Sequence, residues 1–410
     1  MNKNKKNKSI AIFLDSRKES GGEYQHLLYT LDNIKKNNKF NFKFIVICLS
    51  KDLNLNLEKK FNIDVKYFSL NFFDRYLCYL RNHNSLIRRL RKYFFKNKFE
   101  IFLKKNNVDI VYFTSPSQYA LYLEETKFLI TVPDVDHRHH IEFPEVTGDF
   151  EFERKDEIFC KALPKALAVL TNAEIIKERL CYYYNLSRSR IFLISLRPAL
   201  SIDNFVFDEN KNNFFKDKYN LNKNFIYYPA MYLPHKNHKT VIDVIKLLKE
   251  KYFVELNAVF TGSDVGYKKN LLAYSKKQKI ENLINFIDFV DDEALPYFYK
   301  NAFALVFPAL IGPTFIPIWE AFKMEIPVVF SNLEGVKDLY GDAVIYVDPF
   351  DVDQIANAII NLKYDKNKLN RHILKGKSQL ENMKKKNDYV QIFEIINNYR
   401  KIKQTWENIN

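Results

Sequence analysis

The sequence predicts an α/β protein built from two domains, each with a parallel β-sheet flanked by helices. Three observations support this fold class. The 410 residues are enough for two separate hydrophobic cores. Short apolar runs of strand length alternate with longer helical stretches along both halves of the chain. These runs are continuously apolar, which is typical of parallel strands buried on both faces.

The expected strands form two series, separated by a polar and irregular stretch at residues 195–224. This stretch is the predicted boundary between an N-terminal domain, residues 1–205, and a C-terminal domain, residues 220–385. The first series comprises Ile10–Leu14, Phe42–Leu49, Val65–Phe68, Asp109–Phe113, Phe128–Val132, Ala168–Thr171 and Ile191–Ile194. The second comprises Phe225–Tyr228, Leu256–Phe260, Ile284–Ile287, Phe303–Phe307, Pro327–Phe330 and Val344–Val347.

The composition narrows the classes of partner. Lys and Arg number 64 against 49 Asp and Glu, a net charge of +15, which favours nucleic acid, anionic lipid or phosphorylated small molecules. A hydrophobic content of 47% excludes a disordered protein. The four cysteines lie far apart without a C-x-x-C pair, so neither a disulfide framework nor a zinc site is expected. The basic N-terminus lacks a cleavage site, and we do not expect a signal peptide.

Residues 303–330 predict a strand, a loop, a helix and another strand. The loop contains Gly312, Pro313 and Thr314, and it leaves the first N–H groups of the helix to face a cleft, where they could bind an anion. Glu320 lies about one turn further along and could accept hydrogen bonds from sugar hydroxyls. The unit therefore suits a ligand with both phosphate and sugar, although an ordinary buried βαβ unit has the same pattern.

Two further loops follow expected strands. Gly21 and Gly22 precede a helix and would let the backbone approach a ligand closely, or form a plain turn. His235 and Lys236 follow the first strand of the second series. The lysine is a point charge suited to a diphosphate, and a solvent-facing lysine is the plainer interpretation.

Titratable side chains crowd the segment after the strand that ends at Val132. The carboxyl ends of parallel strands are where open α/β sheets bind ligands. A metal site is conceivable from these residue types, and a structural loop with satisfied charges is the plain alternative. The segment contains Asp134, Asp136, His137, Arg138, His139, His140, Glu142 and Glu145.

Residues 81–105 carry nine Lys and Arg against one Glu, with apolar residues at helical spacing. Such an amphipathic helix could lie on an anionic membrane. A solvated helix packed on the sheet is equally compatible with the pattern. Single-strand nucleic-acid binding is disfavoured, because no nucleic-acid module surrounds the stretch.

The order of these segments resembles glycosyltransferase family 4, the retaining transferases of the GT-B fold, over nearly the whole chain. The likeness is strongest in YYPAMYLPHKNHKTVIDVI, FTGSDVGY, INFIDFVDDEALPYFYKNAFALVFPAL, GPTFIPIWEAF, IPVVFSN and YGDAVIYVDPFD. PDVDHRHHIEFPEVTGDFEFERKD resembles a segment of members that make surface polysaccharides. The resemblance implies two Rossmann-like domains facing across a cleft, with a last helix at about 389–406 packed on the N-terminal domain.

The resemblance also implies roles for individual residues. Lys236 matches the phosphate-binding lysine, Glu320 the glutamate that holds the ribose, and Asp134 and His137 the acceptor side. The implied donor site comprises Gly21, Gly22, His235, Gly262, Gly312, Pro313, Thr314, Phe315 and Ile316. No metal ligand and no cofactor are expected.

Three departures from the family pattern affect these assignments. Gly312 stands where the first glutamate of the E-x7-E motif is expected, so another group must contact the donor sugar. Met231 occupies the region of an arginine that many members carry before the lysine. The usual His-Asp pair reads Pro133-Asp134, which is why His137 is the candidate acceptor-side histidine.

The expected function is retaining, metal-independent transfer of a hexose, mannose or a related sugar, from a nucleotide diphosphate sugar to a lipid-linked surface glycan. The expected partners are the nucleotide sugar, the glycan acceptor and, through residues 81–105, an anionic membrane, without nucleic acid. The expected location is the cytoplasmic face of the inner membrane. A sugar-nucleotide epimerase of the same fold and an inactive sugar-binding subunit remain as alternatives.

Overall fold

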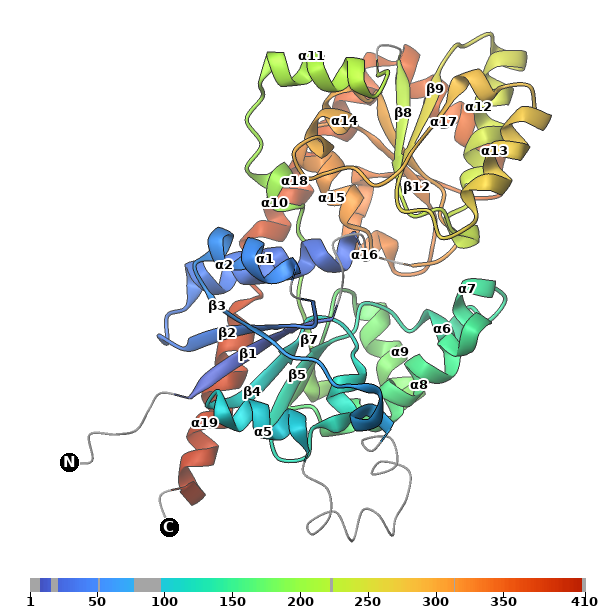
Figure 1. Cartoon of the computed structure of the whole chain (residues 1–410). Coiled ribbons are helices and arrows are strands. Elements are labelled where there is room, and N and C mark those ends of the chain that lie inside the picture. The colour runs from blue at the N-terminus through green and yellow to red at the C-terminus, as the bar shows by residue number, and fades with distance from the viewer. Residues whose placement is uncertain are drawn as a thin grey trace.

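The computed structural model describes residues 8–15, 21–50, 52–76, 97–221, 224–312 and 314–407. Two parallel sheets form the centres of two domains (Figure 1). The first sheet has seven strands in the order β3-β2-β1-β4-β5-β6-β7. Its strands are β1 (Ser9–Leu14), β2 (Lys43–Cys48), β3 (Asp64–Tyr67), β4 (Val108–Phe113), β5 (Lys127–Thr131), β6 (Ala168–Thr171) and β7 (Ile191–Leu193).

The second sheet has six strands in the order β10-β9-β8-β11-β12-β13, and all its neighbours pair in parallel. Both sheets reverse their strand order beside the first strand, the point at which open α/β sheets bind ligands. The predicted fold class is therefore confirmed. The strands are β8 (Phe225–Pro229), β9 (Asn257–Thr261), β10 (Ile284–Ile287), β11 (Ala304–Phe307), β12 (Val328–Ser331) and β13 (Ile345–Val347).

Helices connect the strands and cover both faces of each sheet (Figure 1). Those of the first domain are α1 (Gly22–Asn37), α2 (Asp52–Phe61), α5 (Lys98–Lys105), α6 (Asp136–His139), α7 (Pro144–Thr147), α8 (Glu151–Ala162) and α9 (Glu174–Tyr184). The next two, α10 (Leu200–Asp203) and α11 (Glu209–Lys218), follow β7. The others are α12 (His238–Tyr252), α13 (Lys268–Lys277), α14 (Leu295–Asn301), α15 (Ile316–Lys323), α16 (Val336–Tyr340), α17 (Val352–Tyr364), α18 (Lys366–Lys385) and α19 (Val390–Glu407).

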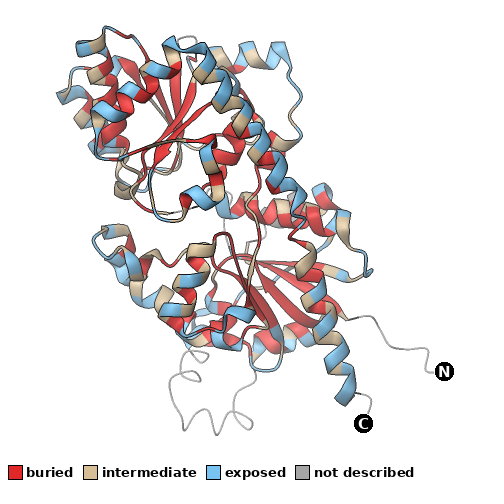
Figure 2. Cartoon of the chain, turned by 180° about the vertical axis from the view of Figure 1, so that it is seen from behind, coloured by how far each residue is buried: buried red, intermediate tan, exposed pale blue. Residues whose placement is uncertain are grey.

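Each sheet lies in its own hydrophobic core, and Figure 2 shows buried residues concentrated along the strands. The chain then returns to the first domain through α19, which lies beside the first sheet (Figure 1). Ile392 and Ile396 pack with Ile10 of β1 in one buried cluster. Phe393 contributes to the neighbouring cluster, on the α1 side of the sheet.

The basic stretch at residues 81–105 lies mostly outside the described residues, which resume at Asn97. The described part contains α5, whose Phe99 and Leu103 are buried against the first sheet. In the described ranges, no helix is both long enough and apolar enough to cross a membrane.

Candidate active site

A cavity of about 610 Å³ lies between the two domains, where the strands of both sheets end. It is large enough for a ligand of several rings. Of the sequence-predicted site residues, ten line it: Gly21, Gly22, Asp134, His235, Lys236, Gly262, Thr314, Phe315, Ile316 and Glu320. Pro313 lies outside the described residues, and His137 and Gly312 are not among the lining residues.

The loop before α15 forms one wall of the cavity. Its amides do not all face the ligand space, because the Phe315 N–H donates to the hydroxyl of Tyr340 at 3.0 Å. Pro317 in the first turn has no N–H. Thr314 in this loop and Ile316, the first residue of α15, line the cavity and are therefore the positions whose backbones could meet an anion.

Glu320 places a carboxylate in the cavity wall with only 4% of its surface exposed. The Tyr299 hydroxyl donates to one oxygen at 2.6 Å, and the Ala199 N–H donates to the other at 3.2 Å. Burial raises the pKa of Glu320 to about 7, although both hydrogen bonds act to lower it. The two hydrogen bonds thus fix the orientation of the carboxylate, while burial favours its neutral form.

Lys236 supplies positive charge to the same cavity. Its ammonium lies 4.6 Å from the ring centroid of Phe315, a cation–π contact. Burial lowers the pKa of Lys236 to about 8, while the carboxylates of Asp136, Asp134 and Glu145 favour its charged form. The lysine remains largely protonated at pH 7 and attracts an anion.

The Nδ1 atom of His235 is not available to a ligand, because it is hydrogen-bonded to Glu145 of α7. The Glu145 carboxylate accepts hydrogen bonds from both the backbone N–H of His235, at 3.0 Å, and the ring nitrogen. This contact joins the two domains beside Lys236. The sequence placed Glu145 in a polar cluster but gave no indication of its partner.

A glycine allows close approach of the backbone at one place in the cavity wall, and a second glycine lies beside α15. A Cβ at Gly262 would lie 2.2 Å from the carbonyl oxygen of Ala230, so no side chain fits there. A Cβ at Gly22 would lie 3.6 Å from Ile316. The start of α1 therefore lies beside the first residue of α15 at the cavity.

Asp134 lines the cavity, and Asp136 lies near enough to Lys236 to interact with it electrostatically. Burial and the neighbouring Asp134 raise the pKa of Asp136 to about 7. These carboxyl groups belong to the first domain and face the lysine of the second.

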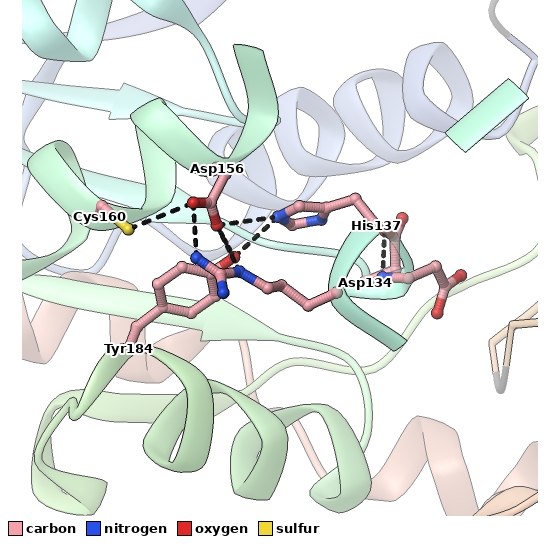
Figure 3. Close-up of polar contacts among 7 residues, drawn as sticks. Asp134, His137, Asp156, Cys160 and Tyr184 are labelled. Carbon is pink, nitrogen blue, oxygen red and sulfur yellow. Dashed lines mark hydrogen bonds and ion pairs between the residues drawn. The ribbon is translucent and has the colours of Figure 1, made fainter. Parts of the chain in front are cut away.

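His137 does not reach the cavity, which corrects the sequence-based assignment of this residue to the acceptor side. Its side chain is completely buried, and its Nε2 lies 2.7 Å from the Tyr184 hydroxyl (Figure 3). The ring also contacts Phe159 at 4.9 Å between centroids. Asp134 and His137 point in different directions (Figure 3), so only Asp134 can contact a ligand.

The partners of His137 form a network around Asp156 of α8 (Figure 3). The Asp156 carboxylate accepts two hydrogen bonds from Arg138, at 2.7 and 2.6 Å, and one from Tyr184, at 2.9 Å. Because Tyr184 donates to Asp156, His137 must donate to Tyr184 through Nε2–H. The network fixes α6 on α8 and α9, and so fixes the segment that carries Asp134.

Other residues of the site gave no signal in the sequence. Tyr299 lies in an apolar helix and reads as a core residue, yet its hydroxyl orients Glu320. Gln25 of α1 donates to Asp292 at 2.7 Å and joins the two domains at the cavity. In the part of the chain that the structure describes, no three His, Cys, Asp or Glu side chains converge as a metal site would require.

We expect His137 to lower the stability of the protein in mild acid. Burial lowers its pKa to about 4, and an unfolded histidine titrates near 6.5. The unfolded chain therefore binds more protons between these values, and the free energy of unfolding falls as the pH falls from about 6.5 to about 4. His137→Gln keeps an N–H donor without this titration, so it should lose less stability than the wild type between pH 7.5 and pH 5 in urea unfolding. If the variant and the wild type lose the same free energy of unfolding over this pH range, His137 is not held neutral in the folded protein.

Comparisons with known proteins agree with this geometry. The family model described as "Glycosyl transferases group 1" matches residues 209–379, which include β8 to β13 and α15. Among solved structures, Anabaena Alr3699/HepE in complex with UDP and glucose superposes with a TM-score of 0.70 at 15% identity. The similarity covers 96% of this chain and 99% of that one. This structural similarity includes both domains and shows that the two chains have the same fold.

Two curated relatives act on O-antigen according to their names. "O-antigen chain mannosyltransferase B" of Escherichia coli is 26% identical over 50% of this chain and 54% of its own length. "O-antigen chain mannosyltransferase RfbU" of Salmonella typhimurium is 24% identical over 48% of this chain and 50% of its own length. The chain thus spans about half the length of these relatives. Residues 209–379 thus match the group 1 glycosyltransferases, the two parallel-sheet domains have the GT-B fold, and the chain is similar to bacterial O-antigen mannosyltransferases.

Proposed function

We propose that this chain transfers a hexose, mannose or a related sugar, from a nucleotide diphosphate sugar to a hydroxyl of a growing surface glycan. One observation carries the proposal: a single interdomain cavity is lined by both Lys236 and Glu320. A nucleotide sugar has a diphosphate for the lysine and ribose hydroxyls for the carboxylate. The O-antigen mannosyltransferases among the relatives and the UDP complex of the Anabaena neighbour support this choice of ligand.

The proposed chemistry relies on electrostatic stabilisation of the leaving group. As the bond between the sugar and the diphosphate breaks, negative charge grows on the nucleoside diphosphate. The Lys236 ammonium and the backbone of the loop before α15 would stabilise that charge without reorganising, because the protein already holds them in place. The sugar then gains oxocarbenium character.

We propose that the reaction retains the anomeric configuration. The acceptor hydroxyl would attack from the face that the diphosphate leaves, and the departing phosphate would take the acceptor's proton. Such a route needs no strong base from the protein. Asp134 lines the cavity on the first domain and would orient the acceptor, whereas His137 acts only through its contacts in the fold.

We further propose that no metal ion and no cofactor take part, because Lys236 and the loop amides provide the charge that a diphosphate requires. Calorimetric titration with GDP-, UDP- and ADP-sugars in EDTA tests this directly. Saturable binding of one donor, followed by transfer in EDTA, is the expected result. Turnover of the donor without an acceptor would favour the epimerase alternative, and binding without any turnover would favour an inactive subunit.

Replacing Lys236 should abolish most of the transfer activity. Lys236→Ala removes the ammonium from the cavity, and losing one such group typically lowers the rate by about 100-fold. Lys239→Ala is the matched control, because this lysine is three residues away and its side chain is 54% exposed in a pair with Asp243. Initial rates of transfer and donor affinity would both be measured. A Lys236→Ala variant with wild-type rates would disprove the proposed role.

Tyr299→Phe should weaken donor binding in a pH-dependent way. The hydroxyl holds down the pKa of Glu320, which burial raises to about 7. Without it the pKa rises further, and Glu320 is protonated at neutral pH. We expect the donor KM to rise roughly tenfold at pH 7 and to recover towards pH 8.5, with little change in kcat. Tyr297→Phe on the same helix is the control, and an unaltered pH profile would refute this role.

A lipid-linked acceptor would bring the protein to the cytoplasmic face of the inner membrane, and we propose that the basic stretch at residues 81–105 binds anionic lipid there. Each basic residue near such a surface contributes about 1 kcal/mol. Binding to phosphatidylglycerol vesicles should therefore fall at least 100-fold when four of these charges are replaced by serine, at Arg88, Arg89, Arg91 and Lys92. The control removes four charges from α18, at Lys366, Lys368, Arg371 and Lys375. If both variants bind the vesicles equally, residues 81–105 are not the lipid-binding segment.

A further inference from the structure

A row of aromatic rings leads away from the cavity across the first domain. It begins at His235, which lines the cavity and lies 6.0 Å from Phe143 between ring centroids. Phe143 contacts His140 at 6.4 Å, and His140 contacts His139 at 4.8 Å. The row thus runs from the loop beside Lys236 onto α6.

The row continues from α6 to the end of α9. His139 Nδ1 lies 3.1 Å from the Tyr183 hydroxyl, and the ring of Tyr183 contacts that of Tyr182 at 5.0 Å. Tyr182 is 82% exposed. All six rings are at least partly exposed, from the cavity edge to the solvent. Aromatic side chains that contact one another in this way usually form a core, so a row that is half-buried at most positions and exposed at His139 and Tyr182 needs an explanation.

The surface under the row is rigid. Arg138, next to His139 in sequence, is held by two hydrogen bonds to Asp156. At the cavity end of the row, Glu145 binds both the backbone and the ring of His235. A ligand that binds here would therefore cost little ordering of the protein.

We propose that this aromatic row is the docking track of the growing glycan, on which the sugar units behind the acceptor unit lie. The proposal rests on the function proposed above. The C–H face of a sugar ring packs well on an aromatic ring, while hydroxyls along the edge of the track can bond to imidazole and carboxylate groups such as Glu142. The row begins at His235 in the cavity wall, so a glycan that is extended in the cavity would continue onto the row as it leaves the cavity. This continuity is the reason for choosing a glycan as the ligand.

The charges around the track fit a neutral sugar chain. Arg179 of α9 is only 11% exposed and is paired with Glu334 at 2.6 Å. Burial and the nearby Arg179 lower the pKa of His139, which favours the neutral form of its ring. Glu142 adds a negative charge with a side chain that is 61% exposed. Among the described residues beside the track, Arg138 and Arg179 are both paired with carboxylates, so the track suits hydroxyls better than anionic lipid headgroups.

Tyr182→Ala and Tyr183→Ala test the proposal with α-linked manno-oligosaccharides of one to six units as probes. Both tyrosines lie at the solvent end of the row, and an aromatic contact contributes about 0.5–1.5 kcal/mol. We expect the KM for the hexasaccharide to rise roughly two- to tenfold in each variant. The KM for the monosaccharide, kcat and the donor affinity should stay unchanged. Tyr182→Phe keeps the aromatic ring and should therefore bind the hexasaccharide as the wild type does. Tyr364→Ala is the control and should have no effect, because Tyr364 is 69% exposed on α17, away from the row.

Saturation-transfer NMR with the hexasaccharide gives a readout that does not depend on transfer. Signals from the oligosaccharide that weaken in Tyr182→Ala would support the track even if no transfer occurred, and only the proposed function would then fail. Equal hexasaccharide binding by wild type and both alanine variants would overturn the track whether or not the protein is a transferase. A loss of binding to phosphatidylglycerol vesicles in these variants, with oligosaccharide binding intact, would also overturn it by assigning the surface to the membrane.

Discussion

The site depends on one positive charge, the ammonium of Lys236, held in a cavity between two domains. Burial lowers its pKa, and the Phe315 ring together with the carboxyl groups of Asp134 and Asp136 offsets that cost. The lysine comes from the loop after β8, whereas the two carboxyl groups come from the loop after β5. Neither domain alone builds this environment. The Glu145–His235 contact, beside the lysine, keeps the two loops together.

Glu320, too, depends on contacts from outside its own domain, because it is hydrogen-bonded to the segment that connects the two domains. One of its oxygens accepts the N–H of Ala199, which lies in the segment that links β7 to the second domain. The same segment is bound at Ser195 by the carboxylate of Asp388, just before α19 returns to the first domain. The second crossing of the chain is therefore hydrogen-bonded to the first, which also supplies the Ala199 N–H to Glu320. A rotation of one domain on the other would change its hydrogen bonds, and with them its pKa.

The fold could be predicted from sequence because continuous apolar runs identify buried parallel strands, and β1, expected at Ile10–Leu14, extends by only one residue. The family resemblance implied one site for Lys236 and Glu320, and the two residues follow β8 and β11, which are neighbouring strands of the second sheet. The error at His137 arose because neighbours on the single turn of α6 point in different directions, so Asp136 acts on Lys236 while His137 enters the core. Tyr299 could not be predicted, since only the packing of α14 shows where its hydroxyl lies.

The glycine at position 312 also has a structural reason. Gly312 has a φ of +96°, which disfavours any other residue. A Cβ there would lie 3.0 Å from the ring of Phe315, the ring that contacts Lys236. A glutamate at this position would strain the backbone and displace Phe315 from the lysine. The packing of Phe315 on Lys236 therefore disfavours the glutamate expected here from the family pattern, and Thr314 is the residue of this loop that lines the cavity beside Phe315.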